Sequence, residues 1–220
     1  MQSLLLAPAA AEDELTARAL ALTGNGVRVA LGITGGPGVG KSTLAMRLVE
    51  GLNAGQPGLA AYVPMDGFHM RHSKLEALGT VRDKGAPHTF EGAAFVEFLR
   101  RLKQATDAIS GPGYSRKIED VVDGAFTIAG DTRLLVVEGN YLLLPEAPWS
   151  GVRPLLDLAV FIDVPREMVR ARLMRRHAEE GLFSEARNRE HVERVDLSNY
   201  DRVAQSRPFA DLAIDLTTDT

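Results

Sequence analysis

The sequence predicts an α/β fold, a doubly wound and mainly parallel sheet with helices on both faces. Apolar segments with the length of buried strands alternate with amphipathic segments with the length of helices. A glycine-rich segment lies between the first of these strands and the helix that follows it. Neither an internal repeat nor a shift in composition divides the chain. We therefore expect one domain over residues 1–220.

The expected strands are short, almost continuous apolar runs, which are typical of strands buried on both faces. They cover residues 27–34, 60–65, 134–137, 158–162 and 212–216. A strand, a helix and a second strand in succession predict a right-handed parallel connection. Ligands of such sheets bind at the carboxyl ends of the strands, so polar residues at those ends are candidate site residues.

The expected helices show apolar residues three and four positions apart. They cover residues 10–22, 41–53, 90–103, 166–180 and 185–203, the last as one helix or two. The polar segment 70–88 is expected to be a loop with one short helix. Residues 114–120 and 125–128 are expected to form a hairpin that turns at Asp123-Gly124.

A phosphate-binding loop is predicted between the strand over 27–34 and the helix over 41–53. Residues 35–42 match the pattern G-x-x-x-x-G-K-[ST]. Glycines let successive backbone N–H groups turn towards an anion, and the helix N-terminus adds its own N–H groups. Lys41 would reach the β- and γ-phosphates of a nucleotide, and Ser42 would bind Mg²⁺. Nucleotide contacts are expected from Gly35, Gly36, Pro37, Gly38, Val39, Gly40, Lys41, Ser42 and Thr43.

This loop narrows the expected fold class to a P-loop NTPase, with ATP and Mg²⁺ as its ligands. A plain glycine-rich turn is the alternative, but such a turn rarely carries four glycines followed by Lys-Ser. A dinucleotide-binding turn would need G-x-G-x-x-G, and the spacing of Gly36, Gly38 and Gly40 does not provide it.

Charge and composition argue against nucleic-acid binding, disulfides, a zinc site and membrane association. A formal net charge of −4 and a pI near 5.8 predict no nucleic-acid partner. The chain has no cysteine, so disulfides and thiolate metal sites are excluded. Its five histidines show no H-E-x-x-H or similar spacing, so no zinc site is expected. No secretory signal or long apolar run is seen, and we expect a cytoplasmic protein without a membrane partner.

Two further segments carry a family resemblance. Residues 65–69 (Met-Asp-Gly-Phe-His) and 137–142 (Val-Glu-Gly-Asn-Tyr-Leu) end two expected strands. Together with the phosphate-binding loop, they resemble the uridine kinase, phosphoribulokinase and bacterial pantothenate kinase group. The resemblance covers about residues 25–216. Within the group, the chain is similar to bacterial proteins described as fructose transport system kinases or nucleoside kinase-like proteins.

The resemblance implies catalytic roles for residues at these strand ends. Asp66 would be the base that accepts the proton of the acceptor hydroxyl, and the alternative is an aspartate that caps the next turn. Glu138 would hold Mg²⁺ or bind the substrate, and the alternative is a structural hydrogen bond. Arg172 and Arg176 would belong to a helical lid over about residues 170–195 that closes over the phosphates. The alternative for the lid is a solvated charged face that also includes Arg175.

The acceptor side is implied by the same resemblance. Substrate contacts are expected from His69, Tyr114, Arg116, Glu138 and Asn140, with Arg71 and His88 as weaker candidates. The segment Tyr-Ser-Arg-Lys at 114–117 departs from the pattern of uridine kinases.

The function expected is therefore an ATP-dependent transfer of phosphate to a hydroxyl of a small molecule. A sugar such as fructose, a nucleoside and a pantothenate-like alcohol are all compatible acceptors. A nucleotide-hydrolysing switch protein is the alternative, although no Asn-Lys-x-Asp or Thr-Lys-x-Asp guanine-reading segment is present. A binding module without catalysis is disfavoured by the intact Lys41, Ser42 and Asp66. The sequence does not indicate an oligomeric state.

Overall fold

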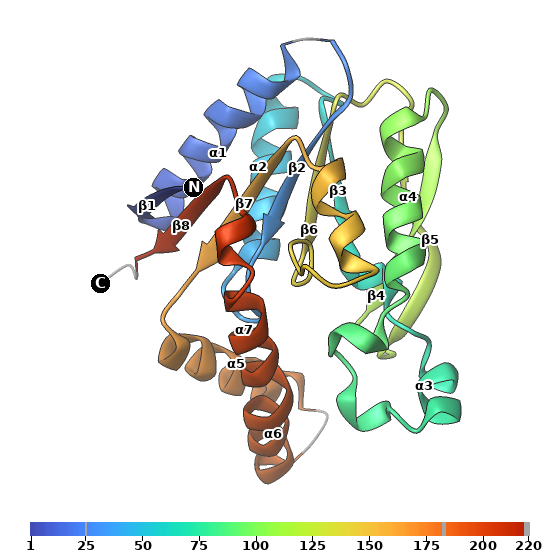
Figure 1. Ribbon diagram of the computed structural model, residues 1–220, viewed down its shortest axis with the longest axis vertical. Helices are drawn as coiled ribbons and strands as arrows, with labels where there is room; N and C mark the ends of the chain where they lie inside the picture. Colours follow the sequence, from blue (N-terminus) through green and yellow to red (C-terminus); the bar gives the residue numbers. More distant parts are fainter. Residues whose placement is uncertain (25, 182–183, 218–220) are drawn as a thin grey trace.

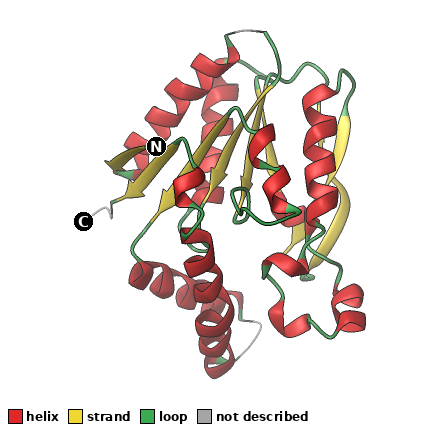
Figure 2. Ribbon diagram, in the orientation of Figure 1, coloured by secondary structure: helices red, strands yellow, loops and turns green. Residues whose placement is uncertain are grey.

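A six-stranded parallel sheet forms the centre of the molecule in the computed structural model, which describes residues 1–24, 26–181 and 184–217 (Figures 1 and 2). Its spatial order is β1-β8-β7-β2-β6-β3, and every neighbouring pair is parallel. The strands are β1 (Gln2–Leu6), β2 (Val29–Thr34), β3 (Ala60–Pro64), β6 (Leu134–Gly139), β7 (Leu158–Asp163) and β8 (Leu212–Leu216). The predicted doubly wound fold is confirmed.

The sequence analysis missed the edge strand β1. It begins with Gln2-Ser3, is exposed or half-buried throughout, and lacks the fully apolar run of a central strand. Its place is set by backbone pairing with β8, where Gln2 lies opposite Leu212 and Leu6 opposite Leu216. Such pairing between the two ends of a chain leaves little trace in local composition.

Helices cover both faces of the sheet, with α1 and α2 on one face and α4 on the other. The helices of the described residues are α1 (Pro8–Thr23), α2 (Lys41–Gly55), α3 (His72–Leu78), α4 (Gly92–Gln104), α5 (Arg166–Glu180), α6 (Glu185–His191) and α7 (Leu197–Ala204). Alternate residues of β2 point to opposite faces: Ala30 joins the core beneath α4, whereas Leu31 and Ile33 join the core beneath α1 and α2. Because both faces are buried, the strands read as continuous apolar runs.

The chain is helical from residue 185 to residue 204. Helix α6 leads into a five-residue π-helix, Val192–Asp196, which continues into α7. Residues 182 and 183 of the predicted lid lie outside the described residues. Figure 1 shows α5, α6 and α7 beyond the carboxyl ends of the strands, on the opposite side from α3. Within the described residues, no helix combines the length and apolarity needed to cross a membrane.

The predicted hairpin exists, but its predicted turn is wrong. Strands β4 (Ile109–Ser115) and β5 (Asp120–Ile128) are antiparallel and turn at residues 116–119. Asp123 and Gly124 lie inside β5 and are exposed. The sequence analysis also missed the first half of β4, which contains Gly111-Pro112-Gly113 and a register shift there. Glycine and proline at a strand irregularity resemble a turn in sequence.

The hairpin packs against the short 3₁₀ helix η1 (Met65–Phe68) that follows β3. A Cβ atom on Gly67 would lie 1.9 Å from the carbonyl oxygen of Pro112. Only glycine allows this backbone approach, because a Cβ cannot move away from the chain that carries it. Gly67 therefore fixes the hairpin beside Asp66.

We predict that Gly67→Ala lowers the free energy of unfolding by about 1–3 kcal/mol, the usual cost of overpacking. The melting temperature should fall by roughly 2–4 °C for each kcal/mol. Gly51→Ala in α2 is the matched control, since nothing lies within 4 Å of its Cβ position. That exposed helical change should instead stabilise by about 0.5–1 kcal/mol. Equal melting temperatures for the two variants would contradict the proposed close contact.

Candidate active site

The phosphate-binding loop lies at the carboxyl end of β2, between β6 and β7 in the middle of the sheet. Gly38 and Gly40 adopt φ angles of 79° and 97°, which side chains other than glycine rarely allow. Helix α2 begins directly after Gly40, so its first N–H groups face the loop. The local structure is therefore an anion-binding turn at a helix N-terminus.

Close packing explains the remaining loop positions. A Cβ on Gly35 would lie 2.3 Å from the carbonyl oxygen of Ile162, and one on Gly36 would lie 2.4 Å from the ring of Tyr200. Val39 is fully buried in the core. Gly35, Gly36 and Val39 therefore shape the loop from behind and do not line the cavity. The predicted loop residues that do line it are Pro37, Gly38, Gly40, Lys41, Ser42 and Thr43.

Lys41 and Glu138 form a buried charge pair beneath the loop. Lys41 is 7% exposed and Glu138 is 4% exposed. The Lys41 Nζ lies 3.6 Å from Glu138 Oε1 and donates a long hydrogen bond of 3.4 Å to the carbonyl oxygen of Gly36. Such long contacts leave Lys41 able to turn towards a phosphate.

Tyr62 and Ser42 complete the surroundings of Glu138. The Tyr62 hydroxyl donates a 2.7 Å hydrogen bond to Glu138 Oε2, and Ser42 also hydrogen-bonds this carboxylate. Burial raises the pKa of Glu138, and the positive charge of Lys41 opposes that shift. A serine hydroxyl beside a carboxylate offers the oxygen donors that Mg²⁺ prefers, so these residues fit the metal. Glu138 lies with the phosphate-binding loop and does not line the acceptor side of the cavity.

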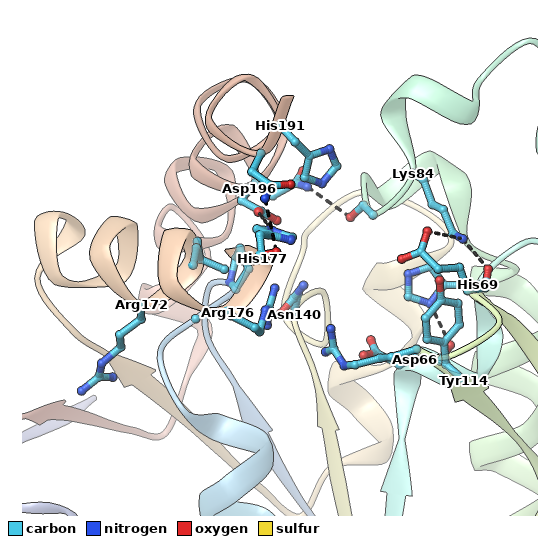
Figure 3. A pocket seen from close by; sticks show the side chains of 18 of the residues that line it. Asp66, His69, Lys84, Tyr114, Asn140, Arg172, Arg176, His177, His191 and Asp196 are labelled. Carbon is cyan, nitrogen blue, oxygen red and sulfur yellow. Dashed lines mark hydrogen bonds and ion pairs between the residues drawn. The ribbon is translucent and has the colours of Figure 1, made fainter. Parts of the chain in front are cut away.

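A cavity of about 1110 Å³ joins most of the other predicted residues (Figure 3). The phosphate-binding loop forms one wall, and α5 contributes Arg172 and Arg176. Asp66, His69 and Tyr114 lie across the cavity from α5, and Arg116 and Asn140 also line it. Asp66 lies in η1, immediately after β3, at the same edge of the sheet as the loop. The structure thus brings the predicted base and the phosphate-binding loop into one cavity.

An aromatic wall lines the side of the cavity on which the sequence predicts the acceptor contacts, which is called the acceptor side below. The His69 ring lies between Phe90 and Tyr114, with centroid separations of 3.9 and 4.5 Å. His69 Nδ1 lies 2.8 Å from the carbonyl oxygen of Asp66, which can only accept, so Nδ1 carries the proton. Burial lowers the pKa of His69 and raises that of Tyr114. Lys84 Nζ lies 5.3 Å from the centre of the Tyr114 ring, which adds a cation to this wall.

Asn140 supplies an unused acceptor. Its side-chain Oδ1 is buried and has no hydrogen-bond partner among the described residues. Asn140 follows β6 and lines the cavity. A buried amide oxygen without a partner is costly, and a substrate hydroxyl or N–H group would satisfy it.

The arginines of α5 separate into two sets. Arg172 Nη1 donates a 3.4 Å hydrogen bond to the carbonyl oxygen of Val39 in the loop. Arg175 is not among the residues that line the cavity; its side chain is 76% exposed and lies 3.8 Å from Glu179. In Figure 3, Arg172 extends away from the acceptor-side residues, whereas Arg176 lies closer to Asn140. The solvated-face interpretation therefore fits Arg175, whereas Arg172 and Arg176 line the cavity.

Sequence reasoning missed residues of the π-helix and α7 that hydrogen-bond to the loop at residues 82–85. Arg194, in the π-helix, donates to Asp83 Oδ1 at 3.0 Å and to the carbonyl oxygen of Arg82 at 2.5 Å. Asn199 donates a 3.1 Å hydrogen bond to the carbonyl oxygen of Gly85. These partners lie in a loop that only the tertiary fold brings close. In the sequence, only the Lys-Gly pair at 84–85 within a polar loop could have indicated these contacts, and such a pair is a weak indication.

The two weaker candidates do not line the cavity. Arg71 pairs with Asp123 on the exposed hairpin, at 2.6 Å. His88 is exposed and lies 3.8 Å from Asp83.

The loop at the end of a central parallel strand, its buried lysine and the carboxylates after neighbouring strands define a P-loop kinase fold. Residues 30–201 match the Phosphoribulokinase / Uridine kinase family, and the chain belongs to that family. It is therefore a nucleotide-binding phosphotransferase, and the resemblance seen in the sequence is confirmed.

Known relatives agree with this assignment. The chain is 35% identical over 190 residues to "Putative uridine kinase C227.14" of Schizosaccharomyces pombe, covering 84% of this chain and 80% of that one. It is 30% identical over 141 residues to a pantothenate kinase of Lacticaseibacillus casei, covering 63% and 46%. A crystal structure of a "putative fructose transport system kinase" from Silicibacter sp. TM1040 superposes with a TM-score of 0.82 and 30% identity. That superposition covers 92% of this chain and 98% of the other.

The lowered pKa of His69 predicts a pH dependence of stability. Below about pH 6.5 this histidine is protonated in the unfolded chain, whereas burial disfavours its protonation in the folded protein. The free energy of unfolding therefore decreases as the pH is lowered. His69→Gln should therefore lose less stability than the parent between about pH 7.5 and pH 5.5. Urea unfolding at both pH values measures this difference. His88→Gln, at an exposed side chain, is the matched control, and a parent-like pH dependence in His69→Gln would contradict the prediction.

Proposed function

We propose that the protein transfers the γ-phosphoryl group of ATP to a hydroxyl of a small molecule held beside Asp66. The observation that carries this proposal is the shared cavity, which both the phosphate-binding loop and Asp66 line. A protein that only hydrolyses nucleotide has no need of a second, aromatic wall with an unused amide acceptor. The alternative of a nucleotide-hydrolysing switch is therefore less well supported.

The chemistry assigned to each residue follows from its position. Backbone N–H groups of the loop and Lys41 would bind the β- and γ-phosphates. Asp66 would orient the acceptor hydroxyl and take its proton as the oxygen bonds to the γ-phosphorus. The bond from that phosphorus to the β–γ bridging oxygen breaks, and ADP leaves with the bridging oxygen. Arg172 and Arg176 would stabilise the charge that develops during transfer.

Ser42 and Glu138 would hold Mg²⁺, with Glu138 acting through water or directly. When bound, the ion would neutralise charge on the phosphate oxygens. The proposal assigns residues 170–195 to a lid over the nucleotide. Since ATP is an intracellular substrate, it also assigns the protein to the cytoplasm.

The acceptor proposed first is a sugar, with fructose as the example. Support comes from the similarity to the Silicibacter structure and from the aromatic wall at His69 and Tyr114, which suits the apolar face of a sugar ring. A nucleoside and a pantothenate-like alcohol are the alternatives, since relatives carry those names. Asn140 Oδ1 would accept a hydrogen bond from any of these acceptors.

A coupled assay of ADP release over sugars, nucleosides and vitamin precursors tests the proposal. ATP and Mg²⁺ alone should give little ADP, and one class of acceptor should raise the rate strongly. Identification of the phosphate ester by mass spectrometry separates transfer from stimulated hydrolysis. Rapid ADP release that no acceptor changes would favour the switch protein instead.

Replacing the proposed base should slow transfer strongly while nucleotide binding is retained. We predict that Asp66→Asn lowers the rate of ester formation by about two to four orders of magnitude. ATP affinity should change by less than about tenfold, because Lys41 and Ser42 remain in place. Ester formation and calorimetric ATP binding are measured in parallel.

Two outcomes of the Asp66 experiment would contradict the prediction. Transfer within a few-fold of the parent would remove Asp66 from the mechanism. Loss of ATP binding together with transfer would make Asp66 a metal-binding or structural residue. Glu138 would then become the candidate base.

The lid arginines should affect turnover more than nucleotide binding. We predict that Arg172→Gln with Arg176→Gln lowers kcat by about tenfold to a thousandfold and changes ATP affinity less, as for a group that acts on developing charge. Arg175→Gln is the matched control on the same helix, because its exposed side chain faces Glu179. Steady-state kinetics measures kcat for the double variant and for the control. If the double variant and the control have the same kcat, α5 is only a solvated charged face.

A further inference from the structure

Three potential metal ligands meet in the helical segment over the cavity. His177 comes from α5, His191 from the end of α6, and Asp196 from the end of the π-helix. One ligand atom from each lies within 4.8 Å of the other two. The residues are 14 and 5 positions apart in sequence, so no short motif reveals the cluster. The sequence analysis predicted no zinc site for that reason.

The geometry of the cluster is close to that of one coordination sphere. His177 Nε2 lies 2.9 Å from Asp196 Oδ2. Two ligands of one tetrahedral zinc ion lie roughly 3.3–3.4 Å apart, given metal–ligand distances of about 2.0–2.1 Å. The His177 and His191 rings are nearly perpendicular, at 82°, with centroids 5.5 Å apart. A small rotation of His191 would complete the set.

The surroundings of the cluster favour a fixed site. The side chains of His177 and Asp196 are only 16% and 12% exposed. Asn188 donates a 3.2 Å hydrogen bond to the carbonyl oxygen of His177, which holds α5 against α6. The π-helix places Asp196 at the cluster, and π-helical turns are frequent at functional sites. The three elements thus hold the ligand atoms within 4.8 Å of one another, and shared ligation requires only a further side-chain rotation.

The cluster also opens towards the active cavity. All three residues line that cavity, and Figure 3 shows them gathered on the side opposite His69 and Lys84. Three protein ligands with one open position are the arrangement of zinc sites that keep a water or substrate oxygen. Two imidazoles and one carboxylate match the donor preferences of zinc and its first-row neighbours.

We propose that His177, His191 and Asp196 form a binding site for a divalent transition-metal ion, with zinc as the preferred ion. The site is separate from the proposed magnesium site at Ser42 and Glu138, and it does not depend on the identity of the acceptor. The bound ion links α5, α6 and the π-helix, and it stiffens the segment that carries Arg176 and Arg194.

Zinc binding is measured directly on the full chain, without nucleotide or Mg²⁺, by competition with a chromophoric chelator. The expected result is one zinc ion per chain, together with a higher melting temperature when zinc is present. His191→Asn and Asp196→Asn should each weaken zinc binding by about tenfold or more, since a three-ligand site loses one ligand. His72→Asn is the matched control: His72 also lines the cavity but lies next to Glu76 on α3.

Two outcomes would overturn the proposal. The first is the lack of saturable zinc binding by the parent protein. The second is unchanged zinc affinity in both His191→Asn and Asp196→Asn, which would make the His177–Asp196 contact an ion pair alone. Melting curves without zinc show whether each variant is folded, and His191→Gln replaces His191→Asn if that variant unfolds. Because no ATP or acceptor is present, these results do not depend on the proposed kinase activity.

Discussion

The buried pair of Lys41 and Glu138 constrains the structure more than any other interaction. Removing two charges from water costs several kcal/mol per ion, and an attraction across 3.6 Å offsets this only with further hydrogen bonds. The Tyr62 hydroxyl and Ser42 supply them to the carboxylate. The pair and its hydrogen bonds require that β3, β6 and the first turn of α2 meet at one point. That point is the carboxyl edge of the sheet.

The cavity extends from this point in two directions. Towards the lid, Arg172 lies over the phosphate-binding loop, and its helix packs Leu173 against the Gly38 position. Towards the acceptor side, η1 carries Asp66 and begins the aromatic wall at His69. Arg194 and Asn199 then connect the two sides through the loop that contains Gly85. These hydrogen bonds hold the π-helix and α7 against the loop that contains Gly85.

The central sheet and the phosphate-binding loop were predictable because their causes are local in sequence. Strands such as β2 and β6 are buried on both faces, so composition alone marks them. Two elements were not predictable in this way. Edge strand β1 depends on pairing with β8, and the position of the hairpin beside Asp66 depends on the close approach of Gly67 to Pro112. Both depend on contacts between segments far apart in the chain.

By itself, the sequence determined the fold class, the phosphate-binding loop and the position of Asp66 after a strand. These follow from residue types at fixed short spacings, which set backbone geometry directly. Only the tertiary structure decided that Glu138 lies behind Lys41, that Arg175 faces solvent, and that His177, His191 and Asp196 meet. Those outcomes depend on which helix faces turn inward and on how distant loops pack. A side chain's partners are set by that packing, and short spacings in the sequence do not encode it.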